Sequence, residues 1–151
     1  MSLLILLIGI PCSGKTTWAK EYVRSKGLTK IISNDEIRKE VTGTEECNPK
    51  ENERIYSLAA EKAEKCLQDG HDVIIDGTNV TIKEWIRYKE ITLRQKKAVI
   101  FACKIFDITP EEALERQKGR ERQVPEEIIR RKYQELSSIL QYTKCFFNFI
   151  L

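Results

Sequence analysis

The chain has 151 residues and a formal net charge of +3, and 41% of its residues are apolar while 32% are charged. This length fits a single domain, residues 1–151, that can bury its own core, and the composition excludes a disordered or low-complexity chain. Five cysteines without a C-x-x-C pair indicate neither a zinc site nor a disulfide framework. The apolar run at 3–10 is too short to span a bilayer, so we expect a cytoplasmic protein without a membrane segment.

Predicted strands and helices alternate along the chain. The unbroken run of branched residues at 2–8 indicates a strand buried on both faces. Helix starts are marked by Asn48-Pro49, by Thr81 with Glu84, and by Thr109-Pro110, because a capping side chain there precedes proline or glutamate. We expect strands at 2–8, 29–33, 71–76 and 98–106, and helices that begin near 15, 34, 49, 82, 110 and 125. The apolar tail at 145–151 is interpreted as a fifth strand or as part of a self-association surface.

This alternation predicts an α/β fold, a three-layer sandwich with a parallel sheet of four to five strands between helices. Ligands in such folds bind outside the carboxyl ends of the strands. The segments that follow the first three strands are therefore the places to look for a site.

The loop after the first strand reads GIPCSGKT at 9–16 and matches G-x-x-x-x-G-K-[ST] at every specified position. Glycines allow a path in which backbone N–H groups cradle phosphate oxygens, and the next helix directs its positive end to the same anion. This P-loop predicts ATP binding, with Lys15 on the β- and γ-phosphates and the Thr16 hydroxyl on Mg²⁺. The expected nucleotide contacts are Gly9, Pro11, Cys12, Ser13, Gly14, Lys15, Thr16 and Thr17.

The segment SNDEIR, at 33–38, follows the second strand. Asp35 is then expected near the γ-phosphate, where a carboxylate can accept a hydroxyl proton and orient the oxygen for in-line attack. Arg38 lies one helical turn further on and can clamp a phosphate of the acceptor. The alternative interpretation is that Asn34 or Asp35 caps the helix and that Asp35 pairs with Arg38.

The third strand ends in VIIDGTN, at 73–79. Asp76 is expected to support Mg²⁺ as a Walker B aspartate does, or else it is a turn residue at the strand end. Thr78 and Asn79 either shape the pocket or cap the following helix.

The stretch RQKGRERQ, at 116–123, has no apolar residue and is predicted to be a mobile loop. A cationic lid at about 115–125 would stabilise charge on the transferring phosphoryl group and exclude water. Arg116 and Arg120 are the favoured pair, with Arg122 next. The alternative is a solvated loop without a role.

Taken together, GIPCSGKTTW, SNDEIR, VIIDGTN and R-x-x-x-R before VPEEII resemble the kinase domain of phage-type polynucleotide 5′-hydroxyl kinases. The resemblance covers most of residues 3–140. It implies that Asp35 is the general base and that Arg38 contacts the nearest phosphate of the acceptor. It also implies that Arg116 and Arg120 act on the ATP phosphates, that Lys15 and Thr16 hold phosphates and metal, and that Asp76 supports them. Because the lid is about one residue shorter than in the family, the second lid arginine is either Arg120 or Arg122.

The resulting hypothesis is a Mg²⁺-dependent kinase that transfers the γ-phosphate of ATP to the 5′-hydroxyl of RNA or DNA. The chain shows no D-x-D-G-T segment, so we expect no 3′-phosphatase activity. It also shows no N-K-x-D motif for recognising guanine, which argues against a GTPase. One alternative keeps the chemistry but uses a small acceptor such as a nucleoside, a nucleotide or another metabolite. Another is a nucleotide-binding regulatory module without transfer. The choice between RNA and DNA, strand preference, donor base and oligomeric state are open at this level.

Overall fold

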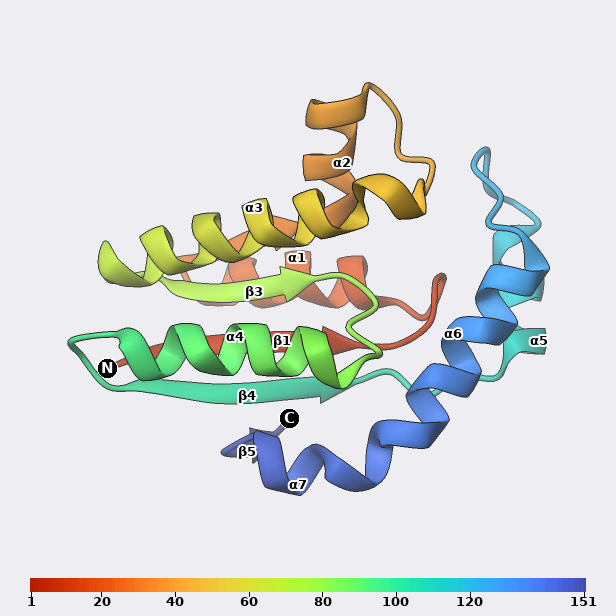
Figure 1. Cartoon of the computed structure of the whole chain (residues 1–151). Helices are drawn as coiled ribbons and strands as arrows, with labels where there is room; N and C mark the ends of the chain where they lie inside the picture. Colours follow the sequence, from red (N-terminus) through yellow and green to blue (C-terminus); the bar gives the residue numbers. More distant parts are fainter.

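A five-stranded parallel sheet forms the centre of the computed structural model, which describes residues 1–151 (Figure 1). Its strands are β1 (Ser2–Ile8), β2 (Thr29–Ser33), β3 (Asp72–Asp76), β4 (Val99–Ile105) and β5 (Phe149–Ile150). They lie in the order β2-β3-β1-β4-β5, and every neighbouring pair is parallel. The predicted α/β sandwich is confirmed. The fifth strand has only two residues, because most of the apolar tail is helical or extended beside the sheet.

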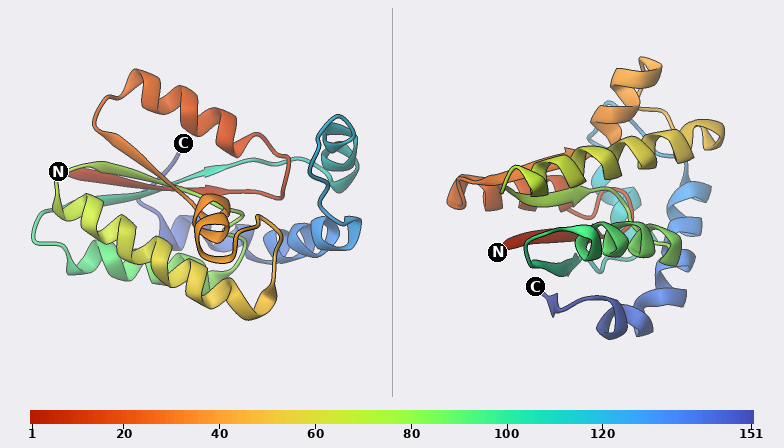
Figure 2. Two further views of the ribbon diagram at one scale, coloured as in Figure 1. Left: turned by 90° about the horizontal axis from the view of Figure 1, so that it is seen from above. Right: turned by 60° about the vertical axis from the view of Figure 1, so that its left-hand side comes forward.

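Helices cover both faces of the sheet. They are α1 (Lys15–Ser25), α2 (Asn34–Thr42), α3 (Pro49–Gln68), α4 (Ile82–Arg94), α5 (Pro110–Gln117), α6 (Glu126–Ile139) and α7 (Thr143–Phe146), with a 3-10 turn at Leu140–Tyr142. Seen from above, α1 lies on one face while α3 and α4 lie on the other (Figure 2). None of these helices combines the length and the apolar character that crossing a bilayer would require.

Local sequence signals set most of the helix starts. Asn48 accepts a hydrogen bond from the backbone N–H of Lys50, and Thr109 accepts one from Glu112. At α4, Thr81 and Glu84 form both halves of a capping box. These side chains satisfy backbone donors that the helix itself leaves free, which is why the predicted starts agree with the structure.

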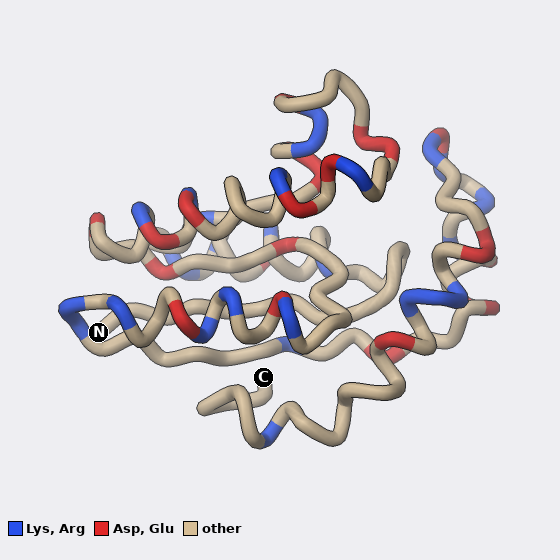
Figure 3. The backbone as a smooth tube through the Cα atoms, viewed as in Figure 1, with Lys and Arg blue, Asp and Glu red and all other residues tan.

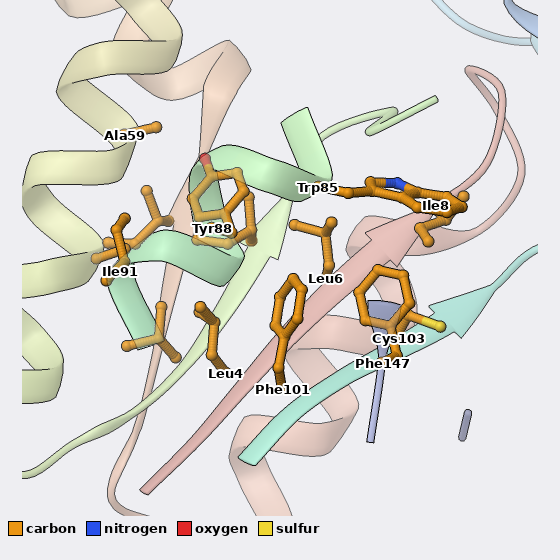
Figure 4. Close-up of a cluster of buried hydrophobic side chains, with 14 of the residues drawn as sticks. Leu4, Leu6, Ile8, Ala59, Trp85, Tyr88, Ile91, Phe101, Cys103 and Phe147 are labelled. Atoms are coloured by element: carbon orange, nitrogen blue, oxygen red, sulfur yellow. The ribbon is translucent and has the colours of Figure 1, made fainter. Parts of the chain in front are cut away.

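The larger core lies between the sheet and the α3–α4 layer. Leu4, Leu6 and Ile8 of β1 point into it, and the alternate residues of the strand face α1 on the other side. Figure 4 shows Trp85 and Tyr88 of α4 over these side chains, with Phe101 and Phe147 beside them. The Phe101 and Phe147 rings lie 4.5 Å apart. The C-terminal tail therefore completes the core, and α4 is an amphipathic helix that buries Trp85 and Tyr88.

The carboxyl ends of all five strands point to one side of the molecule, where the P-loop, the start of α2 and the loop after β3 meet (Figure 1). Beyond that side, α5 and α6 cross the end of the sheet. Parallel topology thus brings together segments that are distant in sequence, and the same edge carries the candidate site.

Candidate active site

The P-loop follows a tightly curled path between β1 and α1. Cys12 and Gly14 have left-handed backbone angles, with φ of 65° and 96°. A side chain at Gly9 would place its Cβ 2.7 Å from the Ser13 hydroxyl and 3.0 Å from the carbonyl oxygen of Phe106, so glycine is needed there for close approach. A curl of this kind, opening into a helix N-terminus, is an anion-binding geometry.

Lys15 lies within this curl. Its ammonium donates to the carbonyl oxygens of Gly9 (3.0 Å) and Ile10 (2.6 Å) and to the Ser13 hydroxyl (3.1 Å). Burial lowers the pKa of Lys15 to about 8, although the charges of Asp76 and Asp35 oppose the shift. The ammonium is therefore held in place by the loop itself, and anionic phosphate oxygens would offer it stronger partners.

Thr16 and Asp76 meet at the mouth of the sheet. The Thr16 hydroxyl donates to Oδ2 of Asp76 at 2.7 Å. Burial raises the pKa of Asp76, while this hydrogen bond and the charge of Lys15 lower it. Hydroxyl and carboxylate oxygens are ligands that suit Mg²⁺. The chain has no cluster of three or more His, Cys, Asp or Glu side chains that could hold a metal, so an ion here would share its coordination with phosphates and water.

Asp35 lies in the first turn of α2 and does not cap it. The cap is Ser33, whose hydroxyl accepts from the backbone N–H of Glu36 at 3.3 Å. The suggestion that Asn34 or Asp35 caps the helix is therefore wrong, although the S-x-x-E spacing could have indicated Ser33. The other half of that alternative is present, because Arg38 donates to Oδ1 of Asp35 at 2.7 Å.

Arg38 is buried, whereas Asp35 is exposed. A second nitrogen of Arg38 lies 3.4 Å from the Asn52 side-chain oxygen on α3, and its Nε is buried without a partner. Packing thus fixes the guanidinium of Arg38, and one of its N–H donors, on Nε, has no partner within the protein. Asp35 is also near enough to Lys15 and Asp76 for its charge to act on the pKa of both. A carboxylate and an arginine thus adjoin the P-loop on one side.

The three arginines of the predicted lid separate into two groups. Arg116 reaches the Cys12 carbonyl oxygen (3.4 Å) and Arg120 reaches the Cys12 sulfur (3.6 Å), so both lie against the P-loop. Arg122 instead lies 3.3 Å from Oδ2 of Asp35 and donates to the backbone carbonyl of Glu45 at 2.8 Å. Figure 3 shows basic positions along the turn that follows α5. Arg120 therefore lies on the P-loop side of the site, and Arg122 lies on the side of Asp35.

The segment predicted as a lid starts in the last turn of α5 and is internally bonded. Helix α5 continues through Gln117, so the non-helical segment is 118–125 and Arg116 belongs to the last helical turn. Gln117 is buried and exchanges two hydrogen bonds with the backbone of Val124, at 3.0 and 2.9 Å. The sequence of this segment, which has no apolar residue at 116–123, does not indicate these bonds, because they depend on the single buried amide of Gln117.

Thr78 and Asn79 support the P-loop, and neither caps α4. The Thr78 carbonyl accepts from the backbone N–H of Gly9 at 3.0 Å, and the buried Asn79 amide donates to the Leu7 carbonyl at 2.7 Å. Trp85 donates to the Asn79 carbonyl at 2.8 Å. The end of β1 is thereby bound to the loop after β3, which fixes where the P-loop starts.

A polar groove of about 480 Å³ lies between the start of α3, the start of α4 and α6. Its lining includes Asn52, so the groove begins next to Arg38. Four basic residues face three carboxylates around it: Lys83, Arg87, Arg131 and Lys132 with Glu53, Glu84 and Glu135. Sequence reasoning missed this groove, because its residues come from three helices that no motif connects.

Comparison with known proteins gives a family and several relatives. A family model described as an AAA domain matches residues 4–139. A protein of Autographa californica nuclear polyhedrosis virus, named as a bifunctional polynucleotide kinase/RNA ligase, is 26% identical over 90% of this chain and 21% of its own length. A chain in the structure of the Pnkp1/Rnl/Hen1 RNA repair complex is similar over 97% of this chain and 46% of its own length, with 25% identity and a TM-score of 0.74.

A gluconokinase from Sinorhizobium meliloti 1021 is also similar, with 15% identity, a TM-score of 0.60, and coverage of 87% of this chain and 73% of its own. At that identity the likeness concerns the fold alone. The chain spans about a fifth of the viral relative and under half of the RNA repair chain.

Proposed function

This chain belongs to the AAA domain family of P-loop proteins, and on that premise we propose that it transfers the γ-phosphoryl group of ATP to the 5′-hydroxyl of RNA or DNA. The observation that carries the proposal is the position of Asp35. Its carboxylate is exposed, lies one turn from the buried Arg38, and acts electrostatically on Lys15 in the P-loop. A phosphate-holding loop beside a carboxylate and an arginine suits phosphoryl transfer to an alcohol.

On the donor side, we propose that the P-loop and Lys15 hold the ATP phosphates, and that Arg116 and Arg120 add charge from the lid. Thr16 and Asp76 would hold Mg²⁺, which supplies charge neutralisation on the phosphate oxygens when bound. Both lid arginines contact Cys12 of the P-loop, which supports their placement on this side.

On the acceptor side, we propose that Asp35 takes the proton of the 5′-hydroxyl as its oxygen attacks the γ-phosphorus. The bond between that phosphorus and the oxygen of ADP breaks, and the products are ADP and a 5′-phosphorylated strand. Arg38 would bind the first phosphate of the acceptor and so fix the hydroxyl in line with the leaving group. Its burial and its hydrogen bond to Asp35 hold the guanidinium in place, which supports its use as a fixed donor for an anion.

The groove beside Arg38 favours a nucleic acid over a small acceptor. It leads from Asn52 over α4 to α6, and its basic residues outnumber its carboxylates by four to three. The names of the viral relative and of the RNA repair complex are in accord with such an acceptor. A small alcohol, by contrast, would need only the space next to Asp35.

The proposal is tested by offering γ-labelled ATP and Mg²⁺ with one acceptor at a time: 5′-hydroxyl RNA, 5′-hydroxyl DNA, nucleoside 3′-phosphates, free nucleosides and gluconate. We expect label on the 5′ end of an oligonucleotide. Label only on a small acceptor would refute the nucleic-acid proposal and favour a metabolite kinase. Binding of ATP without any labelled product would favour the regulatory module.

A further inference from the structure

Arg122 joins three parts of the site that are far apart in sequence. From the lid, its guanidinium contacts the Asp35 carboxylate at 3.3 Å, the Glu45 carbonyl at 2.8 Å and the Glu45 carboxylate at 3.6 Å. Glu45 lies in the segment between α2 and α3. Of the three lid arginines, Arg122 contacts the proposed acceptor side of the site. Arg116 and Arg120 lie against the P-loop instead.

With Arg122 in this position, both oxygens of Asp35 have an arginine partner. Arg38 lies on Oδ1 and Arg122 on Oδ2. A general base must lie within hydrogen-bond reach of the proton that it removes. The guanidinium of Arg122 contacts Oδ2, one of the two oxygens that could accept that proton. Both carboxylate oxygens of Asp35 are therefore engaged while Arg122 stays where the structure has it, although the side chain remains 53% exposed.

The contact of Arg122 with Asp35 is also one that can be exchanged. Their side chains are 40% and 53% exposed, and the Glu45 side chain is 40% exposed, so solvent screens the pair and makes it weak. A phosphate diester bound at the neighbouring Arg38 would be a better partner, because arginine binds phosphate through two parallel hydrogen bonds. Water offers no such bidentate anionic partner and competes for Arg122 less well than a phosphate does.

From this geometry we propose that Arg122 is a specificity-determining residue: it engages Oδ2 of Asp35, so that neither carboxylate oxygen is free to accept a proton from water, and it releases Oδ2 when a phosphate-bearing acceptor enters. The inference rests on the proposed kinase function. In that function, Arg122 would limit the hydrolysis of ATP by water. In that unwanted reaction a water oxygen bonds to the γ-phosphorus, the bond to ADP breaks, Asp35 takes a water proton, and the products are ADP and phosphate. Arg122 suppresses this reaction and then moves to the acceptor phosphate.

The test compares the wild-type chain with Arg122→Gln, Arg122→Lys and Lys118→Gln. Lys118 is a matched control, because it lies in the same segment, is 71% exposed and pairs only with Glu115 of the preceding helix α5. For each protein, ADP release without acceptor and label transfer to a 5′-hydroxyl oligonucleotide are measured under the same conditions, with KM for ATP and for the oligonucleotide. Thermal unfolding verifies that the variants are folded.

We expect Arg122→Gln to raise the ratio of hydrolysis to transfer roughly two- to fivefold, the factor that corresponds to loss of an exposed ion pair. KM for the oligonucleotide should rise and KM for ATP should not. Arg122→Lys should restore the ratio in part, because one ammonium keeps the charge but cannot span Asp35 and Glu45 together. Lys118→Gln should match the wild type.

An unchanged ratio in Arg122→Gln would overturn the inference, and so would an equal change in Lys118→Gln, which would indicate general lid charge. Both outcomes leave transfer by the wild type intact. A wild-type chain that labels no oligonucleotide would instead refute the proposed function itself, so the two failures are distinguishable.

Discussion

The proposed donor and acceptor sides of the site are built in different ways. On the donor side, Lys15 is bonded to backbone carbonyls, Asn79 binds the end of β1, and both are buried. On the acceptor side, Asp35 and Arg122 are held by exposed ion pairs, and only Arg38 is buried. The donor side is thus part of the fold, whereas the acceptor side depends on contacts that a substrate can replace. Substitutions on the two sides should therefore have different consequences.

The largest expected effect separates chemistry from ATP binding. Asp35→Asn removes the proposed base but keeps a similar volume beside Arg38, so phosphoryl transfer should fall by about 10²- to 10⁴-fold, the usual contribution of a general base. ATP affinity should stay near the wild-type value, because Lys15 and the P-loop are untouched. Single-turnover transfer and calorimetric ATP binding measure the two quantities. A variant that transfers at the wild-type rate would show that Asp35 is not the base.

The next effect concerns the metal. Asp76→Asn removes a carboxylate charge next to the Thr16 hydroxyl, and the apparent Mg²⁺ affinity should fall about 10- to 100-fold, as is typical when a supporting group of a metal site is lost. Titrating transfer activity with Mg²⁺ measures the shift. Asp72→Asn is the control, since that residue lies at the opposite end of β3. Equal Mg²⁺ dependence in both variants would contradict the assignment of Asp76.

The third effect tests whether the donor side is part of the fold. Asn79→Ala removes a buried hydrogen bond to the Leu7 carbonyl and should lower the free energy of unfolding by about 1–3 kcal/mol, because that acceptor is left unpaired. Urea denaturation measures the loss. Asn52→Ala is the matched control on the acceptor side, where the half-buried amide meets Arg38 at 3.4 Å. If both variants lost the same stability, the contrast between the two sides would be wrong.

The smallest effect concerns the groove. A double variant, Arg131→Gln with Lys132→Gln, should raise KM for a 5′-hydroxyl oligonucleotide a few-fold and reduce the slope of log affinity against log salt by about 2, one for each lost phosphate contact. KM for ATP should not change. Lys65→Gln, at the far end of α3 from the groove, is the control. The groove would lose its assignment if a nucleoside 3′-phosphate were affected as strongly as the oligonucleotide.

Much of the fold could be predicted from the sequence, because its signals are local. The apolar run of β1, the capping box at Thr81 and the P-loop pattern each lie within a short stretch, and the predicted sandwich is confirmed. The tail is harder to predict: Phe147 packs on Trp85 and Phe101, a tertiary contact that no local pattern shows, and β5 has only two residues.

The arrangement of the site depends on contacts over long sequence separations. No pattern within one segment shows that Thr78 accepts from Gly9, that Gln117 bonds to Val124, or that Arg122 meets Asp35 across 87 residues. The groove is a further example, since its charges come from three helices. The sequence therefore names candidate residues, while the sheet topology decides which of them face one another. Their catalytic roles stay predictions.

The central claim is that Asp35 faces an acceptor hydroxyl across the P-loop from the donor phosphates. An experimental structure with Mg²⁺, a non-hydrolysable ATP analogue and a 5′-hydroxyl oligonucleotide tests it most directly. We expect the hydroxyl oxygen about 2.6–3.2 Å from the Asp35 carboxylate, the first acceptor phosphate on Arg38, and Arg122 moved away from Asp35. An oligonucleotide whose 5′ end lies elsewhere, with Asp35 still paired to Arg122, would contradict it.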